Sequence, residues 1–269
     1  MNEMVDRRIL GAFVCMDAIT KTQVTVPMLA AAPQWALKAN RSGIYVIFNG
    51  PGLSAQTGQF MPVPPWPGPV KFEVSLQDPN RKYLPRRVTV EAPQSVPVIP
   101  PAPAGSLTNP AAVSAMGDPA TVFSPQPVTV YRAPSAPVGP NWATIHASVT
   151  QSGVSPARGL PWAVLRITRD ADAKELAVGI TDPSGEALLA VTGLTTQTST
   201  GGGGPVTIST VAVTVKVYFD PSNLTQPSGW FPDPDDVLNN LSNPLLKQMS
   251  QPLQLSAGQQ LALSFALAV

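Results

Sequence analysis

Alternating hydrophobic and polar residues mark the stretch 70–92 as a pair of β-strands. Residues 70–77, VKFEVSLQ, carry a hydrophobic residue at every second position, and the positions between them are polar. This period of two is typical of a strand that buries one face. After a turn, residues 86–92, RRVTVEA, repeat the alternation with Val88 and Val90 on the inward face. We therefore predict a β-hairpin over 70–92.

Shorter strand patterns run through the rest of the chain, separated by turn residues at intervals of about ten residues, which is the signature of a β-sandwich. Residues 233–249 suggest one or two helical turns instead, with Asp233 or Asp235 as the N-cap. The last pattern has a candidate turn at Ala257–Gly258. The predicted strands lie in 8–16, 23–29, 44–48, 127–133, 142–151, 162–170, 174–182, 187–194, 205–220 and 251–269.

Proline groups these strands into two modules. The 269 residues include 32 Pro and 20 Gly, yet 43% of the residues are hydrophobic. Because Pro lacks a backbone donor and fixes φ, dense Pro excludes long helices, while the hydrophobic share is enough for real cores. We predict an all-β protein with two small β-sandwich modules, 1–92 and 141–269. A long Pro- and Ala-rich linker, 93–140, joins them and contains one short strand.

Two similar Asp-Pro stretches occur, one in each predicted module. LQDPNRKYL spans 76–84, and ITDPSGEAL spans 180–188. Asp at the first turn position can bond its own backbone two residues on, and Pro at the second position has its φ pre-set. We interpret the stretches as equivalent hairpin turns that re-enter the cores at Leu84 and Leu188, which indicates a duplicated module. The residues assigned to these turns are Asp78, Pro79, Asp182, Pro183 and Gly185.

The second stretch carries a family resemblance. In VGITDPSGEALLAV, an apolar strand leads into Thr181 and Asp182, Gly185 forms the turn, and a second apolar strand begins around Leu188. This resembles the carboxypeptidase-regulatory-like, or transthyretin-like, β-sandwich. The resemblance implies a structural module without a catalytic site of its own, of a kind attached to enzymes, adhesins and secretion machinery. It therefore implies a fold more than a function.

The first stretch matches this family pattern in part. Asp78 and Leu84 stand at the expected positions, whereas Gln77 replaces the Thr and Arg81 replaces the turn Gly. The matched region is confined to the surroundings of this turn.

A second resemblance concerns the architecture of the whole chain. The paired β-modules, the PAP sequence of the linker and the turn around Tyr83, Leu84 and Pro85 look like accessory components of phage-tail-like contractile injection particles. This resemblance implies a cap, baseplate or connector in a large assembly.

The charge of the chain bears on its partners. There are 17 Lys and Arg residues against 16 Asp and Glu residues, and charged residues make up 12% of the chain. Such a surface argues against electrostatic binding of nucleic acid and gives little protection against association. The strand patterns at 206–219 and 259–269 could leave open sheet edges, which also favours a place in an assembly.

The apolar segments are short. No apolar run approaches the ~20 residues that a membrane-spanning helix needs, so we expect no membrane span. The apolar stretch Ile9–Met16 follows Asp6 and has no convincing cleavage site, so we expect no signal peptide. The expected location is the cytoplasm at synthesis and a particle afterwards.

Candidate catalytic and metal-binding residues are few. His146 is the one histidine and Cys15 the one cysteine, which excludes an intrachain disulfide and a zinc cluster. Both stand in strand patterns, where surface or core roles fit them better than catalysis. The acidic run Asp233–Asp236 lacks the spacing of a calcium loop and fits a helix N-terminus, although calcium binding stays open. We expect no enzymatic activity, no cofactor and no metal.

Two tryptophans in Pro-rich loops are the candidate partner contacts. Trp66, and Trp230 with the adjacent Phe231, could anchor a partner surface, because a Trp flanked by Pro is a rigid contact. The alternative that each Trp caps its own sandwich stays open. Trp142 and Trp162 are expected in cores.

These observations predict a non-enzymatic structural or interaction protein. Its partners would be other protein subunits, including copies of itself, bound through apolar loops and strand addition. The alternative is a carbohydrate-binding or adhesin-like surface module, which an exposed, coplanar pair of aromatic rings on one sheet face would favour.

Overall fold

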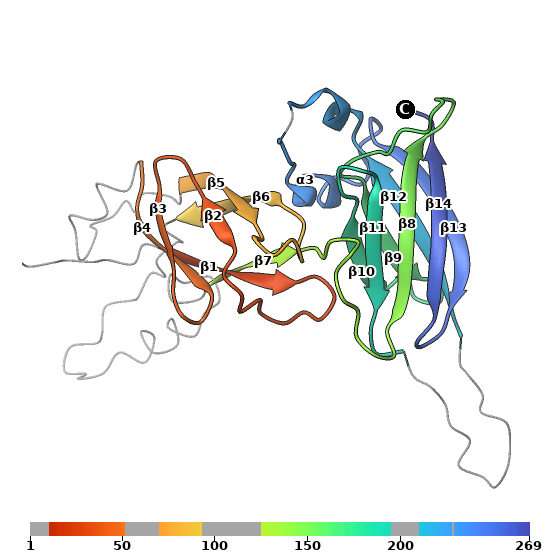
Figure 1. Ribbon diagram of the computed structural model, residues 1–269, viewed down its shortest axis with the longest axis horizontal. Helices are drawn as coiled ribbons and strands as arrows, with labels where there is room; N and C mark the ends of the chain where they lie inside the picture. The colour runs from red at the N-terminus through yellow and green to blue at the C-terminus, as the bar shows by residue number, and fades with distance from the viewer. Residues whose placement is uncertain (1–10, 52–69, 93–124, 195–209, 228) are drawn as a thin grey trace, which may run out of the picture. The chain divides into compact units, whose positions relative to one another are not determined.

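The computed structural model describes residues 11–51, 70–92, 125–194, 210–227 and 229–269. Within these residues the chain is almost entirely β-structure, which confirms the predicted all-β class (Figure 1). A short α-helix, α3 (Pro234–Leu238), and a 3-10 helix, η1 (Pro221–Thr225), interrupt the strands. No helix in these ranges is long and apolar enough to cross a membrane. The strands are β1 (Gly11–Asp17), β2 (Leu29–Ala31), β3 (Ala36–Ala39), β4 (Ile44–Asn49), β5 (Val70–Gln77), β6 (Arg86–Ala92), β7 (Gln126–Val130), β8 (Ala143–Gln151), β9 (Val164–Arg169), β10 (Glu175–Ile180), β11 (Glu186–Val191), β12 (Val211–Phe219), β13 (Lys247–Leu255) and β14 (Gln260–Leu267).

The chain divides into two compact units, and neither is one continuous stretch of sequence. Unit 2 takes in two short segments, Asp17–Thr22 and Gln77–Arg87, that the predicted division at residue 92 assigns to the first module. The units are, within the described ranges, unit 1 (Met1–Met16, Gln23–Leu76 and Val88–Thr129) and unit 2 (Asp17–Thr22, Gln77–Arg87 and Val130–Val269).

Unit 1 contains a four-stranded sheet of order β3-β4-β1-β7 and a three-stranded sheet of order β2-β5-β6. β5 and β6 are neighbours in the second sheet, and Val74 and Val90 on their inward face are fully buried, so the predicted hairpin over 70–92 is confirmed. Phe13 of β1 stacks on Tyr45 of β4, with 4.7 Å between the ring centroids. These residues form the apolar interior of the unit.

Strand predictions in unit 1 differ from the structure at 23–29 and at β3, where no strand was predicted. The predicted strand at 23–29 is reduced to an isolated bridge between Met16 and Gln23, and the regular strand β2 begins only at Leu29. β2 and β3 have three and four residues, which is too short for a period of two to be recognised. β7 supplies the predicted short strand at 127–133 and joins the unit 1 sheet beside β1. Residues 93–124 of the predicted linker lie outside the described residues.

Unit 2 is built on a β-sandwich. One sheet has the order β10-β9-β12-β13, and the other has the order β11-β8-β14. Alternate residues of both sheets point inward and form one apolar core. In β12, Val213, Val215 and Val217 are fully buried, whereas Lys216 between them is exposed. The predicted sandwich in the second half of the chain therefore has its alternation on the expected residues.

The long strand patterns near the C-terminus occupy different places in these sheets. β12 pairs with β9 on one side and β13 on the other, so the expectation of an open edge at 206–219 is wrong. β14 pairs in parallel with β8 and ends its sheet, so within the described ranges its other edge has no strand partner. β13 and β14 follow each other in sequence but belong to opposite sheets, and they do not form a hairpin.

Candidate functional site

The outward face of the β10-β9-β12 sheet carries a second apolar cluster, which we call the outer-face cluster. Val164, Val178, Ile180 and Tyr218 alternate with core residues and so point away from the sandwich interior. Burial of this face against apolar side chains from other segments of unit 2 fixes those segments on the sheet. The covering residues are Ala18, Leu84, Tyr131, Ala133, Trp162, Phe231, Val237 and Leu246.

A buried arginine fixes the segment Gln77–Arg87 to helix α3. Arg86 is fully buried, and its Nη2 donates to Oδ1 of Asp233 at 2.5 Å and to Oδ2 of Asp235 at 2.8 Å. Burial opposes the guanidinium charge, but Asp235 and Asp233 outweigh it and raise the pKa of Arg86. The prediction missed this residue, although its spacing from Val88 and Val90 places it on the buried face of β6.

Asp233 also caps helix α3. Its carboxylate accepts a 3.0 Å hydrogen bond from the N–H of Asp235, so of the two predicted N-cap candidates, Asp233 and Asp235, the cap is Asp233. The acidic run Asp233–Asp236 thus contains a helix cap and two partners of Arg86.

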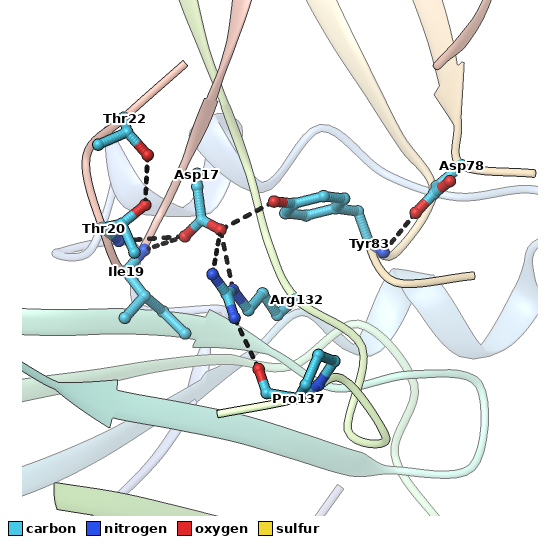
Figure 2. A network of polar contacts seen from close by, with 8 residues as sticks. All are labelled: Asp17, Ile19, Thr20, Thr22, Asp78, Tyr83, Arg132 and Pro137. Carbon is cyan, nitrogen blue, oxygen red and sulfur yellow. Dashed lines mark hydrogen bonds and ion pairs between the residues drawn. The ribbon is translucent and has the colours of Figure 1, made fainter. Parts of the chain in front are cut away.

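A second polar network centres on Asp17 (Figure 2). Oδ2 of Asp17 accepts from the Tyr83 hydroxyl at 2.9 Å and from Nε and Nη2 of Arg132, each at 2.8 Å. Oδ1 accepts from the backbone N–H groups of Ile19 at 2.8 Å and Thr20 at 3.1 Å. Burial opposes the charge of this carboxylate, but the bonds from Thr20, Ile19, Tyr83 and Arg132 prevail and hold the pKa of Asp17 below its ordinary value.

The two Asp-Pro stretches form turns with the same hydrogen-bond pattern. The N–H of Arg81 donates to the carbonyl of Asp78, and the N–H of Gly185 donates to the carbonyl of Asp182, each at 3.0 Å. The Asp78 carboxylate accepts from the N–H of Asn80 at 2.9 Å. The equivalent bond from Ser184 to Asp182 is 2.8 Å. In both turns, therefore, the carbonyl and the carboxylate of Asp accept hydrogen bonds from the N–H groups that follow.

The strands that these turns connect are arranged differently. The turn at Asp78 closes the β5–β6 hairpin within one sheet, whereas the turn at Asp182 carries the chain from β10 to β11 in the opposite sheet. The prediction that both are hairpin turns is therefore wrong for the second one. A turn pattern shows where the chain reverses but not which strands then pair.

The turn at Asp182 is packed tightly against a neighbouring loop. The Thr181 hydroxyl donates to the Leu160 carbonyl and accepts from the Ala163 N–H, both at 2.8 Å. A Cβ on Gly159 would lie 1.9 Å from the Ser184 carbonyl oxygen. Gly185 has a φ of +85°, so it requires a residue that tolerates the left-handed region.

Both turns line one cleft in unit 2, with a volume of about 880 Å³. Asp78 and Arg81 of the first turn line it, as do Asp182 of the second turn and Arg158. The half-buried ring of Trp230 forms part of the wall, together with prolines that bring rigid apolar surface. These prolines are Pro85, Pro134, Pro161, Pro183 and Pro227.

The predicted partner-binding residues differ in exposure. Trp230 is half-buried, and the Arg87 guanidinium lies 5.7 Å from its ring centroid. Phe231 also lines the cleft but is only 8% exposed and belongs to the outer-face cluster, so its main contacts are internal. Trp66 lies outside the described residues.

Three of the other predicted residues are placed as follows. Trp162 is buried in the outer-face cluster, as expected of a core residue. Trp142 is half-buried beneath the Arg132 guanidinium, which lies 5.0 Å from its ring centroid, so the prediction of a core position is wrong. Pro79 is exposed and does not line the cleft.

The candidate chemical residues lie away from the cleft. His146 is exposed on β8, and Cys15 is buried in β1. Among the residues that the structure describes, no group of three or more His, Cys, Asp or Glu side chains is arranged to hold a metal ion. The described lining of the cleft contains neither His nor Cys. The cleft therefore offers guanidinium groups, carboxylates, aromatic surface and proline rings as its binding groups.

Comparisons with known proteins add little to this geometry. No protein-family model matches the chain, and no curated protein matches it. Among solved structures the chain is similar to the Bacillus anthracis TIE protein, with 9% sequence identity and a TM-score of 0.27. The match covers 97% of the chain and 34% of that protein, so the chain spans about a third of its length. A likeness at this level supports no conclusion about fold or function.

Proposed function

We propose that the protein is a non-enzymatic interaction protein whose unit 2 cleft docks a segment of another protein subunit. The observation that carries the proposal is the cleft itself, in which a half-buried Trp230 stands among five prolines. Partly exposed Trp on rigid surroundings is typical of the anchors that dominate protein interfaces. In a larger setting, the protein would be an accessory component, such as a cap, baseplate or connector of a contractile phage-tail-like particle.

The proposal of no enzymatic activity is supported by the state of the carboxylates at the cleft. Asp78 and Asp182 each accept hydrogen bonds from backbone N–H groups of their own turn. A general base must reach a proton of the substrate through a free lone pair. The carboxylates of Asp78 and Asp182 are instead engaged as turn formers. Neither His146 nor Cys15 lines the cleft.

The unpaired edge of β14 supports a second contact by strand addition. Charged residues and proline are what usually protects an edge strand from pairing with another strand. β14 has eight residues, QLALSFAL, and contains no charged residue and no proline. Its core-facing Leu261 and Leu263 are only partly buried. An added strand would pair with the backbone and cover these leucines.

The transthyretin-like resemblance of unit 2 is part of the same proposal. Each family-pattern residue of the second stretch has a structural reason: Thr181 bridges two backbone groups, Asp182 organises the turn, and Gly185 takes a positive φ. The carbohydrate-binding alternative has less support, because Trp162 is buried and leaves Trp230 without a second exposed indole among the described lining residues.

Affinity purification of the full chain from its native cells tests the proposal, with Trp230→Ala compared with Trp142→Ala. Both tryptophans are half-buried and stacked by an arginine, but Trp142 does not line the cleft. We expect a protein subunit to co-purify with the wild type and with Trp142→Ala, and to be lost with Trp230→Ala. Equal loss from both variants, or no partner at all, would contradict the proposal.

A further inference from the structure

We infer that the cleft recognises a proline-containing segment that carries acidic side chains, and that these pair with Arg81 and Arg158. The inference rests on the proposed function, because it names the chemistry of the segment that the cleft would dock. It adds a requirement for charge to the apolar contact at Trp230.

The two arginines at the cleft have no acidic partner among the described residues. Arg81 and Arg158 both line the cleft and are exposed. Neither forms an ion pair with any residue that the structure describes. Arginine presents a planar fork of donors that matches a carboxylate in a bidentate manner. Other arginines of unit 2 do pair with carboxylates, among them Arg86, Arg132, Arg166 and Arg169.

The aspartates at the cleft do not meet this need. The Asp78 carboxylate accepts from the N–H groups of Asn80, Lys82 and Tyr83 at 2.8–3.1 Å. Oδ1 of Asp182 accepts from the N–H groups of its own turn at 2.8 and 3.0 Å. Each carboxylate is thus held by backbone N–H groups of its own turn and forms no ion pair with Arg81 or Arg158, so both guanidinium groups are open to an incoming carboxylate.

The backbone conformation of Arg81 gives an independent reason to assign it a role. Arg81 has a φ of +57°, and the residue at the same place in the second turn is Gly185, with a φ of +85°. Residues with a Cβ are disfavoured in this region, and glycine is not. Strained residues of this kind are enriched at functional sites. Of the six described non-Gly residues with a positive φ, Arg81 and Trp162 line the cleft. Arg81 holds a guanidinium at the cleft where glycine would form the easier turn.

The walls of the cleft favour a peptide over a sugar polymer. Trp230 and the proline rings form an apolar surface of the kind on which extended, proline-containing peptides dock. Such peptides are already close to their bound conformation, so little conformational entropy is lost on binding. An acidic polysaccharide could also pair with arginines, and the experiment therefore includes one.

The test selects linear peptides from a random display library on the full chain and titrates the enriched peptides, and polygalacturonate beside them, by calorimetry. The variants are Trp230→Ala, the double variant Arg81→Gln with Arg158→Gln, and Arg41→Gln as the matched control, because Arg41 is exposed but belongs to unit 1. We expect enriched peptides to contain Pro together with Asp or Glu. We expect the double variant to bind them at least about tenfold more weakly and Arg41→Gln to bind them as the wild type does. Arg81→Gly removes the guanidinium while favouring the turn, so a weaker affinity in this variant cannot be assigned to a misfolded turn.

The outcomes separate this inference from the proposed function. Enrichment of neutral peptides that need Trp230 but tolerate the double variant would overturn the acidic requirement and leave the docking cleft in place. Absence of any peptide whose binding depends on Trp230 would overturn both. Binding of polygalacturonate in preference to every enriched peptide would overturn the peptide as the ligand.

Discussion

The hydroxyl of Tyr83 donates a 2.9 Å hydrogen bond to the carboxylate of Asp17, which stands 66 residues earlier in the chain. Arg132 donates to the same oxygen at 2.8 Å. Three segments of unit 2 that are distant in sequence thus meet at one buried carboxylate (Figure 2). The backbone N–H of Tyr83 also donates to the Asp78 carboxylate at 3.1 Å, so the network connects to the turn at Asp78, which lines the cleft.

Removing this hydroxyl tests the network. We expect Tyr83→Phe to lower the free energy of unfolding by about 1–2 kcal/mol, because the buried carboxylate loses a donor. The measurement is urea unfolding followed by tryptophan fluorescence. Tyr218→Phe is the matched control, since Tyr218 is also buried but its hydroxyl makes no hydrogen bond with the described residues. A loss as large in the control would mean that the Asp17 bond contributes nothing specific.

The network also predicts a dependence on acid. The pKa of Asp17 is lowered from an ordinary value of 3.8, and a carboxyl of this kind stabilises the folded state above its unfolded pKa. That contribution is lost as the pH falls through the lower, folded pKa. We expect the stability difference between the wild type and Asp17→Asn to be constant near neutrality and to shrink below pH 3.8. A difference that stays the same at low pH would contradict this assignment.

Arg86 gives a prediction about the attachment of helix α3. Arg86→Met should lower the free energy of unfolding by about 3 kcal/mol, because the largely buried Asp233 loses the cation that compensates its burial. Arg166→Met serves as the control, since Arg166 pairs with Glu175 at a site where both side chains are partly exposed. Such a pair contributes less than about 1 kcal/mol. Thermal unfolding of the two variants measures the contrast, and similar midpoints would refute the special role of Arg86.

The cost of a side chain at Gly185 in the second turn can be compared with the cost at Gly153. Both glycines have a positive φ, but Gly153 has open space around it. Gly185 and Gly153 have φ values of +85° and +75°. A Cβ on Gly185 would lie 2.5 Å from the Val149 carbonyl oxygen, whereas a Cβ on Gly153 meets no atom within 4 Å. We expect Gly153→Ala to destabilise the protein by about 1 kcal/mol and Gly185→Ala by more than about 2 kcal/mol, measured by urea unfolding. Equal losses would show that the close contact relaxes freely.

The strands were predictable where one face is buried and the other is solvated. β5 shows this, since its alternation follows burial residue by residue. β12 shows it as far as Val217, after which the outward-facing Tyr218 is buried as well, by the outer-face cluster. Which strands pair could not be read in the same way. β13 and β14 resemble a hairpin in sequence, yet β14 pairs in parallel with β8, more than a hundred residues away. Alternation reports the face of a strand and contains no information about its neighbour.

The same limit applies to the cleft. The Asp-Pro turns and Trp230 were visible as local turn chemistry and as an aromatic residue among prolines. Their meeting in one cleft depends on contacts between distant segments, which a local pattern does not contain. Arg86 was within reach, because alternation places it on the face of Val88 and Val90. Its charge argued for the surface, and the carboxylates that make its burial possible lie 147 and 149 residues further on.

The passage of the chain between the two units has a consequence for genetic dissection. The boundaries after Met16, Thr22, Leu76, Arg87 and Thr129 mean that no single cut in the gene yields either unit whole. A fragment that starts at residue 130 would lack Leu84 and would leave Val164 and Ile180 without part of their apolar cover. Neither unit can be exchanged between proteins as a continuous cassette, so an intact unit is obtained only when both are produced together.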